Sequence, residues 1–387
     1  MAPGRDRRSA LRSENSKTVL LTLGRLPVAL DLARGFKRAG WRVVVAESQA
    51  MSLCRMSSAV DVYAPAPSPK YARQAYLECL QNLIHEHQPS LVVPVSEETV
   101  SVAHLAADGS TPVFCSTPEK TLELHDKLAF NRLAAGIGMP VPESWPADEA
   151  GALAESSEPK VVKPRFAASG RGFRVVQNAA DIPHDPTLMV QAFCDGEEVS
   201  GFAVAREGQV IASVVYRSLV NAGSVAVCFE RLSNQTGIEN WMQRFVQAVR
   251  HTGFIAFDFI VDDDGVPQAI ECNPRATSGL HFLRGEELPA VIAGSSSTAP
   301  RLRAETKLVE SYSCFTAMLG ALGDCRRRRS AWSALRSSTD ISWNARDPRP
   351  FLLMTVNSWP IIWSSLRHRI SFAEAAVADI EWCDGPG

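Results

Sequence analysis

The chain has 387 residues, of which 45% are hydrophobic and 21% are charged, and its formal net charge is -2. This length predicts two or three domains, and the composition is that of an ordinary globular protein, so a small disulfide-stapled scaffold is excluded. The balanced charge shows no polyelectrolyte character, and we expect no nucleic-acid partner.

The cysteines and the two ends of the chain indicate a cytoplasmic protein. The nine cysteines include no Cys-x-x-Cys pair, which favours reduced thiols over a disulfide framework or a zinc site. Residues 1–16 are basic and polar without the apolar core of a signal peptide, so we expect either a disordered tail or a wrongly assigned start there. The apolar run from Phe351 to Trp363 is shorter than the roughly 20 residues of a membrane span, and we expect no membrane contact.

Residues 17–116 predict a domain in which strands and helices alternate. The run from Thr18 is typical of a buried strand, and a second strand is expected at 42–48. Between them Pro27 opens a helix and Gly40 closes it. This β-α-β unit favours a parallel sheet. The elements expected next are a helix at 71–87, a strand at 91–95, a helix at 98–107 and a strand at 112–115.

The turn after the first strand does not favour a dinucleotide site. After Gly24 it lacks the second and third glycines that let the backbone approach a pyrophosphate. Glu47, Glu97 and Glu98 stand at predicted strand ends, where ligands of such sheets bind. Each of these glutamates is either a contact for a substrate amine or an ordinary acid at a solvated strand end.

A second domain is expected from 117 to 295. Residues 116–119 form a helix-start signal, and the helix is predicted to run to about Ala135. Short strands are then expected at 160–164, 173–176, 188–193, 199–206 and 209–217, with a hairpin turn at Glu207-Gly208. A helix that carries Trp241 follows, and then two strands flank the acidic turn 262–265.

These last two strands carry the most informative polar residues, Asp258, Glu271 and Asn273. Antiparallel pairing across the acidic turn places Asp258 opposite Ala269, with Glu271 as a diagonal neighbour roughly 7–8 Å away. Asn273 falls on the same face, and two carboxylates with an amide oxygen suit Mg²⁺. The alternative is a solvated hairpin face, but the flanking positions are apolar, and an uncompensated acidic face on buried strands would be costly.

A second group of residues could bind phosphates. Lys163 ends a predicted strand, and the small-residue loop 167–172 follows it. Backbone N–H groups of such a loop can close over phosphates, although Ser-Gly runs are also ordinary hairpin loops. Lys127 and Lys163 supply the compact charges that a triphosphate needs. The residues that could line a base-and-ribose slot are Gln191, Phe193 and Glu198.

The order and spacing of these motifs resemble the ATP-grasp superfamily. The motifs are Asp126-Lys127, Lys163-Pro164, the loop 169–172, the segment 191–198, Asp258 and the segment 271–275. The resemblance covers about residues 18–290, and the first domain looks like the pre-ATP-grasp domain of carbamoyl-phosphate-synthase-like and amino-acid ligase members. It implies a mixed α/β and α+β fold, with a Rossmann-like domain at 17–116, a two-lobed ATP-grasp domain at 117–295 with its lid at about 145–200, and a small C-terminal α+β appendage at 296–387.

The resemblance also implies ATP and one or two Mg²⁺ ions as cofactors, with Mn²⁺ as a substitute, and a role for each matching residue. The implied nucleotide contacts are Lys127, Lys163, Ser169, Gly170, Gly172, Gln191, Phe193 and Glu198. The implied metal ligands are Asp258, Glu271 and Asn273, and the implied catalytic residues are Arg275, which faces the transferred phosphoryl group, and Lys163. Gln191 departs from the usual glutamate near the adenine, and Ala167 and Ala168 replace glycines common in the lid loop.

The implied activity is an ATP-dependent carboxylate-amine ligase that acts on small acids and amines such as amino acids, and we expect a homodimer. Phosphorylation of carbamate or bicarbonate, nucleotide binding without catalysis, and an NAD-dependent oxidoreductase are the alternatives. Arg217, on a strand expected to face the site, is a candidate contact for a substrate carboxylate, as is Arg275.

The C-terminal region is locally basic. Residues 301–350 contain ten Lys or Arg and five Asp or Glu, including the run Arg326 to Arg329. We interpret this run as a solvated loop, with docking against the acidic remainder or an anionic substrate as the alternative. Short strands are expected at 340–342 and 379–382.

Overall fold

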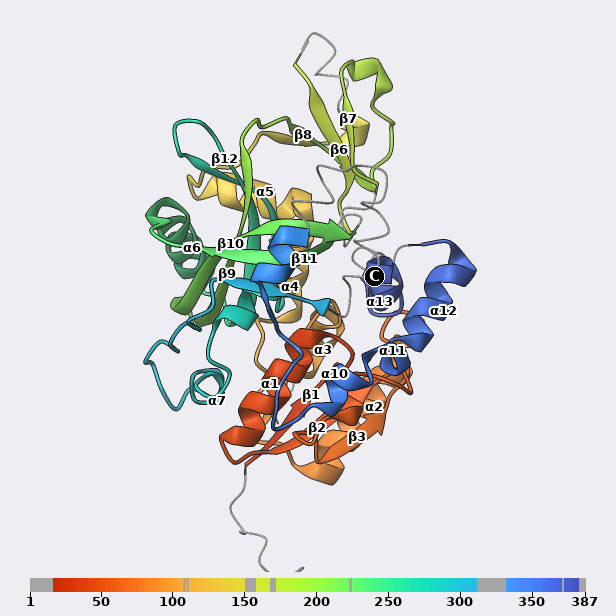
Figure 1. The fold of residues 1–387 in the computed structure, drawn as a ribbon. Helices are drawn as coiled ribbons and strands as arrows, with labels where there is room; N and C mark the ends of the chain where they lie inside the picture. The colour runs from red at the N-terminus through yellow and green to blue at the C-terminus, as the bar shows by residue number, and fades with distance from the viewer. Residues whose placement is uncertain are drawn as a thin grey trace, which may run out of the picture.

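The structure is a computed structural model that describes residues 17–106, 109, 111–149, 158–167, 172–222, 225–311, 332–370 and 372–382. Three sheets are stacked along the molecule, with the N-terminal domain at one end and a small sheet at the other (Figure 1). The expected tail 1–16, the lid-loop residues Ser169 and Gly170, and the run Arg326 to Arg329 lie outside the described residues. None of the helices in the described ranges is long and apolar enough to cross a membrane.

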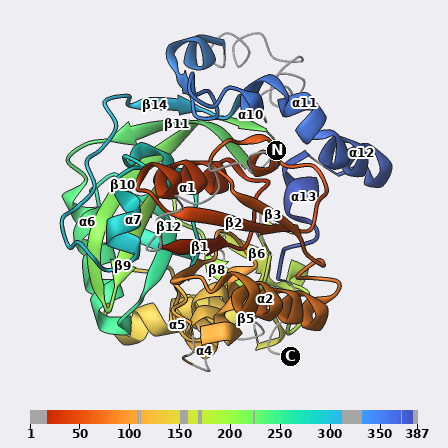
Figure 2. The same cartoon turned by 90° about the horizontal axis from the view of Figure 1, so that it is seen from below.

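The N-terminal domain is a doubly wound parallel sheet with strand order β3-β2-β1-β4. Its elements are β1 (Thr18–Leu21), α1 (Pro27–Arg38), β2 (Arg42–Glu47), β3 (Val62–Pro65), α2 (Arg73–His87), β4 (Leu91–Val93) and α3 (Thr99–Val102). Alternate residues of β1 pack on opposite sides, Val19 with α1 and Leu20 with α2. Figure 2 shows α1 and α2 on opposite sides of this sheet. Burial on both faces explains the continuous apolar runs of the strands.

Three expectations for this domain need correction. Strand β3 was not predicted, because it has only four residues and just one of them is buried. The expected strand at 112–115 forms only an isolated bridge, because Val113 alone pairs with the edge strand β4, at Val92. The expected helix at 98–107 is one α-helical turn followed by a 3₁₀ turn, Ala103–Ala106.

The helix expected from 117 to 135 is two helices, because Asp126 begins a new one. These are α4 (Pro118–His125) and α5 (Lys127–Gly136). The Asp126 carboxylate accepts hydrogen bonds from the backbone N–H groups of Leu128 and Ala129, which makes it the N-cap of α5. Arg165 donates to the same carboxylate. The break therefore fixes Lys127 at the first residue of α5 and beside the lid.

The lid lobe is a four-stranded antiparallel sheet with order β5-β8-β6-β7. Its strands are β5 (Ser144–Pro146), β6 (Lys160–Pro164), β7 (Arg174–Val176) and β8 (Leu188–Ala192). The bounds predicted for β6 are confirmed, and β5 was not anticipated. Its small core includes Val162 and Val190, which pack inside the lobe.

The large sheet has seven strands in the order β13-β12-β9-β10-β11-β14-β15. The elements of its ATP-grasp-like part are β9 (Glu197–Arg206), β10 (Gln209–Ala222), β11 (Val225–Leu232), α6 (Thr236–Val249), β12 (Gly253–Val261), β13 (Pro267–Asn273) and α7 (Leu288–Ile292). Helix α6 covers one face through Trp241 and Phe245, which pack on Phe257. The other face packs on α1 and shares a core with the N-terminal domain.

The C-terminal region joins this sheet and is not a separate appendage. Its elements are β14 (Lys307–Val309), β15 (Thr339–Asp340), α10 (Arg349–Leu352), α11 (Met354–Asn357), α12 (Trp359–His368) and α13 (Phe372–Val377). Strand β14 pairs with β11, and β15 pairs with β14. The strand expected at 379–382 is absent from this described segment, which forms the turn after α13 because Asp379 bonds to Arg25.

Candidate active site

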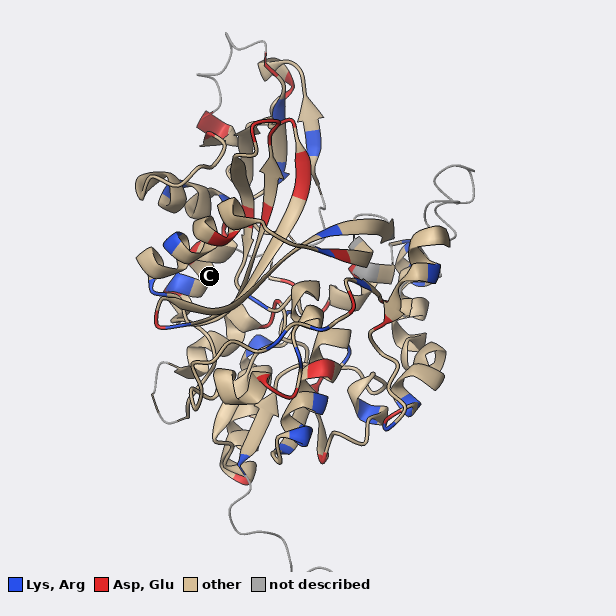
Figure 3. Cartoon of the chain, turned by 60° about the vertical axis from the view of Figure 1, so that its left-hand side comes forward, with Lys and Arg blue, Asp and Glu red and all other residues tan. Residues whose placement is uncertain are grey.

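A pocket of about 780 Å³ opens where the lid, the large sheet, the N-terminal domain and α13 meet. Small-molecule sites commonly occupy pockets of about 300–1,000 Å³. Figure 3 shows basic and acidic positions intermingled over the described chain. Since neither sign dominates one part of the ribbon, the charge of the pocket depends on the side chains that line it. The predicted site residues that line it are Lys127, Lys163, Gln191, Phe193, Glu198, Asp258, Glu271, Asn273 and Arg275.

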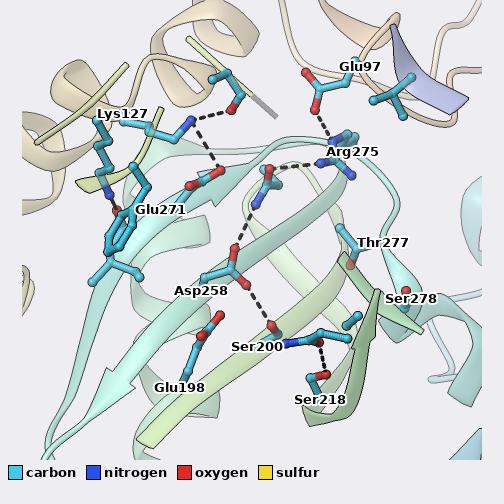
Figure 4. A pocket seen from close by; sticks show the side chains of 18 of the residues that line it. Glu97, Lys127, Glu198, Ser200, Ser218, Asp258, Glu271, Arg275, Thr277 and Ser278 are labelled. Carbon is cyan, nitrogen blue, oxygen red and sulfur yellow. Dashed lines mark hydrogen bonds and ion pairs between the residues drawn. The ribbon is translucent and has the colours of Figure 1, made fainter. Parts of the chain in front are cut away.

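The two carboxylates lie closer in register than the sequence predicted. Asp258 lies directly opposite Glu271, whereas the prediction placed it opposite Ala269, because Val261 pairs with Pro267 at the turn and a bulge follows between Phe259 and Asp258. The bulge adds one residue to β13, which re-aims the following side chains. Asn273 lies on the same face, and its Nδ2 donates to Asp258 Oδ2 at 3.2 Å (Figure 4). The three predicted metal ligands are therefore adjacent.

The chemistry of this group fits Mg²⁺. The Asp258 carboxyl has a pKa raised to about 6, first by burial and then by the negative charge of Glu271. A divalent cation between the two carboxylates would offset that repulsion, and the donors are all oxygens. Within the described ranges, no group of three or more His, Cys, Asp and Glu side chains forms a metal site. The site thus needs the Asn273 amide and oxygens from a bound phosphate to complete the ligand set.

Two buried lysines flank Glu271. Lys127 Nζ lies 3.4 Å from Glu271 Oε1 and donates to the Ala167 carbonyl at 2.7 Å. Lys163 Nζ donates to the Ile270 carbonyl at 2.9 Å. Burial lowers the pKa of Lys163 to about 8, partly opposed by Glu271. The Lys127 ammonium therefore lies beside the Glu271 carboxylate, and the Lys163 ammonium lies against the backbone of the preceding residue on the same strand.

Arg275 stands at the junction with the N-terminal domain. Its Nε donates to Glu97 Oε1 at 2.5 Å, and its guanidinium also donates to Asn273 Oδ1 at 3.2 Å. Burial acts to raise the pKa of Glu97, but Arg275 and His125 lower it below its usual range. Glu97 lines the pocket and holds Arg275.

The other two strand-end glutamates have structural partners. Glu98 accepts from the Thr22 hydroxyl and from the backbone N–H groups of Val95 and Ser96. Glu47 accepts from the Gly24 backbone and from Arg25. Neither lines the pocket.

The lid side of the pocket carries the predicted base-and-ribose residues. Gln191 on β8 is buried and donates to Ser144 Oγ at 3.3 Å, while Phe193 is 44% exposed and Glu198 on β9 is exposed. All three line the same pocket as Asp258. An exposed aromatic ring and a carboxylate in the same pocket are suited to a nucleoside.

Comparison with known sequences finds relatives of this central region. A family model for the ATP-grasp domain matches residues 124–279. Residues 124–279 thus match an ATP-grasp domain. Formate-dependent phosphoribosylglycinamide formyltransferase of Synechococcus sp. is 30% identical over 194 residues, which are 47% of this chain and 45% of that protein. The carbamoyl phosphate synthase large chain of Deinococcus radiodurans is 23% identical over 239 residues, 55% of this chain and 23% of that one. The chain therefore spans less than half the length of these curated relatives.

Solved structures agree on the fold around the ATP-grasp domain. Biotin carboxylase of Campylobacter jejuni has a TM-score of 0.61 at 16% identity and covers 74% of each chain. The L-amino acid ligase of Bacillus licheniformis has a TM-score of 0.60 at 16% identity, over 75% of this chain and 78% of that one. The biotin carboxylase domain of Hydrogenobacter thermophilus 2-oxoglutarate carboxylase, solved with MgADP and bicarbonate, has a TM-score of 0.60 at 15% identity, over 74% of this chain and 72% of that one.

One predicted residue of the ATP-grasp domain does not reach the pocket. Arg217 pairs with Glu197 and Glu230, each at 2.8 Å, and it is absent from the described lining. Its neighbours Tyr216 and Ser218 do line the pocket, because successive residues of β10 point to opposite faces. Arg217 is therefore not assigned to the substrate.

Several residues of the ATP-grasp pocket were missed by the sequence analysis. Ser200 lies opposite Asp258 across β9 and β12, and its Oγ donates to Asp258 Oδ1 at 2.7 Å. The period of two from Glu198 along β9 could have identified it. No local signal marks Leu26, Phe229 or Ala376, since each reads as an ordinary core residue, yet all three line the pocket.

Proposed function

We propose that the protein is an ATP- and Mg²⁺-dependent ligase that activates a small-molecule carboxylate for attack by an amine and so forms an amide. The observation that carries the proposal is that Asp258 and Glu271 face Lys127, Lys163 and Arg275 in one pocket of an ATP-grasp domain. We also propose that the enzyme acts in the cytoplasm. Its assembly as a homodimer stays a prediction.

The reaction has two displacement steps. A carboxylate oxygen attacks the γ-phosphorus of ATP, the bond to the bridging oxygen breaks, and ADP leaves. The amine nitrogen then attacks the acyl carbon, and phosphate departs with the proton that the amine gives up. Neither step uses a nucleophilic side chain. The enzyme therefore contributes mainly by positioning the reactants and by neutralising the charge of the phosphates.

The residues divide this work by position. Asp258, Glu271 and Asn273 would hold Mg²⁺, which when bound neutralises charge on the phosphates. Lys127 and Lys163 would hold the phosphate oxygens from the lid side. Ser200 keeps the Asp258 carboxylate oriented. Arg275, fixed by Glu97, would hold the carboxylate whose oxygen receives the phosphoryl group.

The test is ADP release with amino acids offered singly and in pairs. We expect release that requires Mg²⁺, ATP and an accepted acid-amine pair, with stoichiometric amide and phosphate. Glu271→Gln and Asn273→Ala should each reduce turnover by at least about 100-fold, as loss of charge stabilisation in a phosphoryl-transfer site predicts. Full turnover in both variants would contradict the metal assignment.

The same assay separates the alternatives. ADP release that bicarbonate stimulates without any amine would instead support a carboxylase or carbamoyl-phosphate type of reaction, as the names of several relatives suggest. Tight ATP binding with no ADP formed on any acceptor would support a protein that binds the nucleotide without catalysis.

A further inference from the structure

The part of the pocket away from the lid is lined by apolar side chains. They come from the start of α1, from β11 and from α13, three segments far apart in the sequence. We call this group the apolar subsite, and its residues are Leu26, Val28, Ala226, Phe229, Ala376 and Val377. Three of these side chains, Val28, Phe229 and Ala376, belong to the main hydrophobic core and the other three pack against it, so the subsite is a place where that core opens into the pocket.

The apolar subsite is separate from the metal group. Across the sheet Asp258 pairs with Ser200, Ser200 with Tyr216, and Ser218 on that same strand with Phe229. These are three strand spacings of about 4.8 Å each, and Ser218 lies two residues along the strand from Tyr216, so Phe229 is more than about 14 Å from Asp258. A substrate group in the subsite therefore extends beyond the space next to the phosphates.

Polar side chains at the border of the subsite already have partners. Ser218 bonds to the Asn221 side chain, and Ser278 donates to Glu310 at 3.2 Å. The Tyr216 hydroxyl donates to Thr277 at 3.3 Å. A polar or charged ligand group placed against the apolar wall would thus lose hydration without a matching partner. An apolar group would gain by leaving water.

The wall formed by α13 is held in place by a buried ion pair. Arg25 is fully buried, its Nε donates to Glu47 at 2.9 Å, and its Nη1 lies 2.5 Å from Asp379 Oδ1. The same guanidinium donates to the Ala376 carbonyl at 3.4 Å, and Ser68 donates to the Asp379 carbonyl at 2.7 Å. These contacts fix the end of α13 against the carboxyl end of β2.

We propose that the apolar subsite binds the side chain of the acid or amine substrate, and that the substrate carries a branched aliphatic or aromatic group. This inference rests on the proposed function. The carboxylate end of the same molecule lies toward Arg275, and the side chain lies between β11 and α13. Ala376 and Val377 are the specificity-determining residues contributed by the C-terminal region, outside the segment that matches the ATP-grasp family.

The first test measures binding without turnover. The protein is saturated with Mg²⁺ and a non-hydrolysable ATP analogue, and leucine, phenylalanine, serine and aspartate are titrated by calorimetry. These probes share a carboxylate and an amine and differ only in the side chain. We expect leucine or phenylalanine to bind at least about 10-fold more tightly than serine and aspartate, the discrimination that an apolar pocket gives for small differences in size. Equal or tighter binding of the polar probes, or no binding of any apolar probe, would overturn the inference.

The second test fills the subsite. Ala376→Phe should weaken leucine and phenylalanine binding at least 10-fold, on the scale expected when a pocket loses its space, while the affinity for the ATP analogue stays unchanged. Ala378→Phe, just beyond α13 and not among the lining residues, is the matched control and should leave both affinities unchanged. If Ala376→Phe does not fold, Val377→Ala enlarges the same wall and should favour phenylalanine over leucine. An unchanged ratio in the folded variants contradicts the inference.

The two proposals fail in different ways. If apolar amino acids bind but no acceptor of the full panel causes ADP release, the proposed ligase activity is contradicted and the apolar subsite is still supported. If the protein forms amides and binds polar substrates as tightly as apolar ones, the ligase activity is supported and the apolar subsite is contradicted.

Discussion

Arg275 Nε lies 2.5 Å from Glu97 Oε1, and this contact joins the end of β13 to the N-terminal domain. Glu97 is 3% exposed, so the pair is shielded from water and its geometry depends on both domains. The N-terminal domain, which holds no residue of the metal group, therefore positions the guanidinium that we assign to the substrate carboxylate.

Glu97→Gln should reduce kcat/KM for ligation by about 10- to 100-fold, as removal of a positioning contact predicts. The amide keeps the shape of the side chain and loses the charge that holds Arg275. Steady-state kinetics and titration with an ATP analogue provide the measurement, and nucleotide affinity should stay within about twofold, because the phosphate-binding lysines are untouched. The exposed Glu119→Gln is the control. A variant that loses nucleotide affinity and keeps kcat would contradict the assignment.

Magnesium should stabilise the complex with nucleotide through Asp258 and Glu271. In the wild-type protein we expect the melting temperature to rise further with Mg²⁺ and an ATP analogue than with the analogue alone, because a ligand that binds only the folded state stabilises it. EDTA should remove this increment. In Asp258→Asn the Mg²⁺ increment should disappear while the response to the analogue itself remains. An equal increment in that variant would place the ion elsewhere.

Asp379→Asn should weaken the attachment of α13. The variant loses the charge that faces Arg25, and unfolding free energy should fall by about 1–3 kcal/mol, the cost of weakening a hydrogen bond to a buried charge. Urea denaturation measures the loss, and the exposed Asp264→Asn is the matched control. The affinity for an apolar substrate should fall with it, whereas the affinity for the nucleotide should not. If both proteins unfold at the same urea concentration, the ion pair does not stabilise this region.

Acid should weaken the N-terminal domain through Asp31. Burial opposes its charge, but Arg303 and His281 outweigh burial and lower the pKa of Asp31 to about 2. The folded protein therefore binds this proton less readily than the unfolded chain. The stabilisation, about 2 kcal/mol, is complete above pH 4 and is lost as pH falls from about 4 to 2. Urea midpoints of wild type and Asp31→Asn across this range should converge at the acidic end, and a constant gap would contradict the assignment.

The sequence predicted what depends on near neighbours. The strand at 160–164 and the shared face of Asp258, Glu271 and Asn273 follow from local patterns, and the structure contains them. Each depends on residues within one strand or one hairpin. The motif order was enough to identify the ATP-grasp domain.

The remainder depends on contacts between distant segments or on small local irregularities. The bulge beside Asp258 moved the register by one residue, and nothing in the composition of β13 marks it. The pair Arg25 and Asp379 spans 354 positions of sequence, so no local pattern could reveal it. The sequence did not show which face of its strand Arg217 occupies. Its partner Glu230 lies on β11, a strand that was not predicted.

The attachment of α13 also affects the order in which the parts of the pocket form during synthesis. Domains fold largely in the order in which the ribosome delivers them, from the N-terminus. Arg25 and Glu47 are made early, whereas Asp379 emerges 354 residues after Arg25. A nascent chain can thus form the nucleotide-binding part before it possesses one wall of the pocket. The apolar wall that α13 contributes is then added after the segments that carry the proposed nucleotide contacts, when Asp379 reaches Arg25.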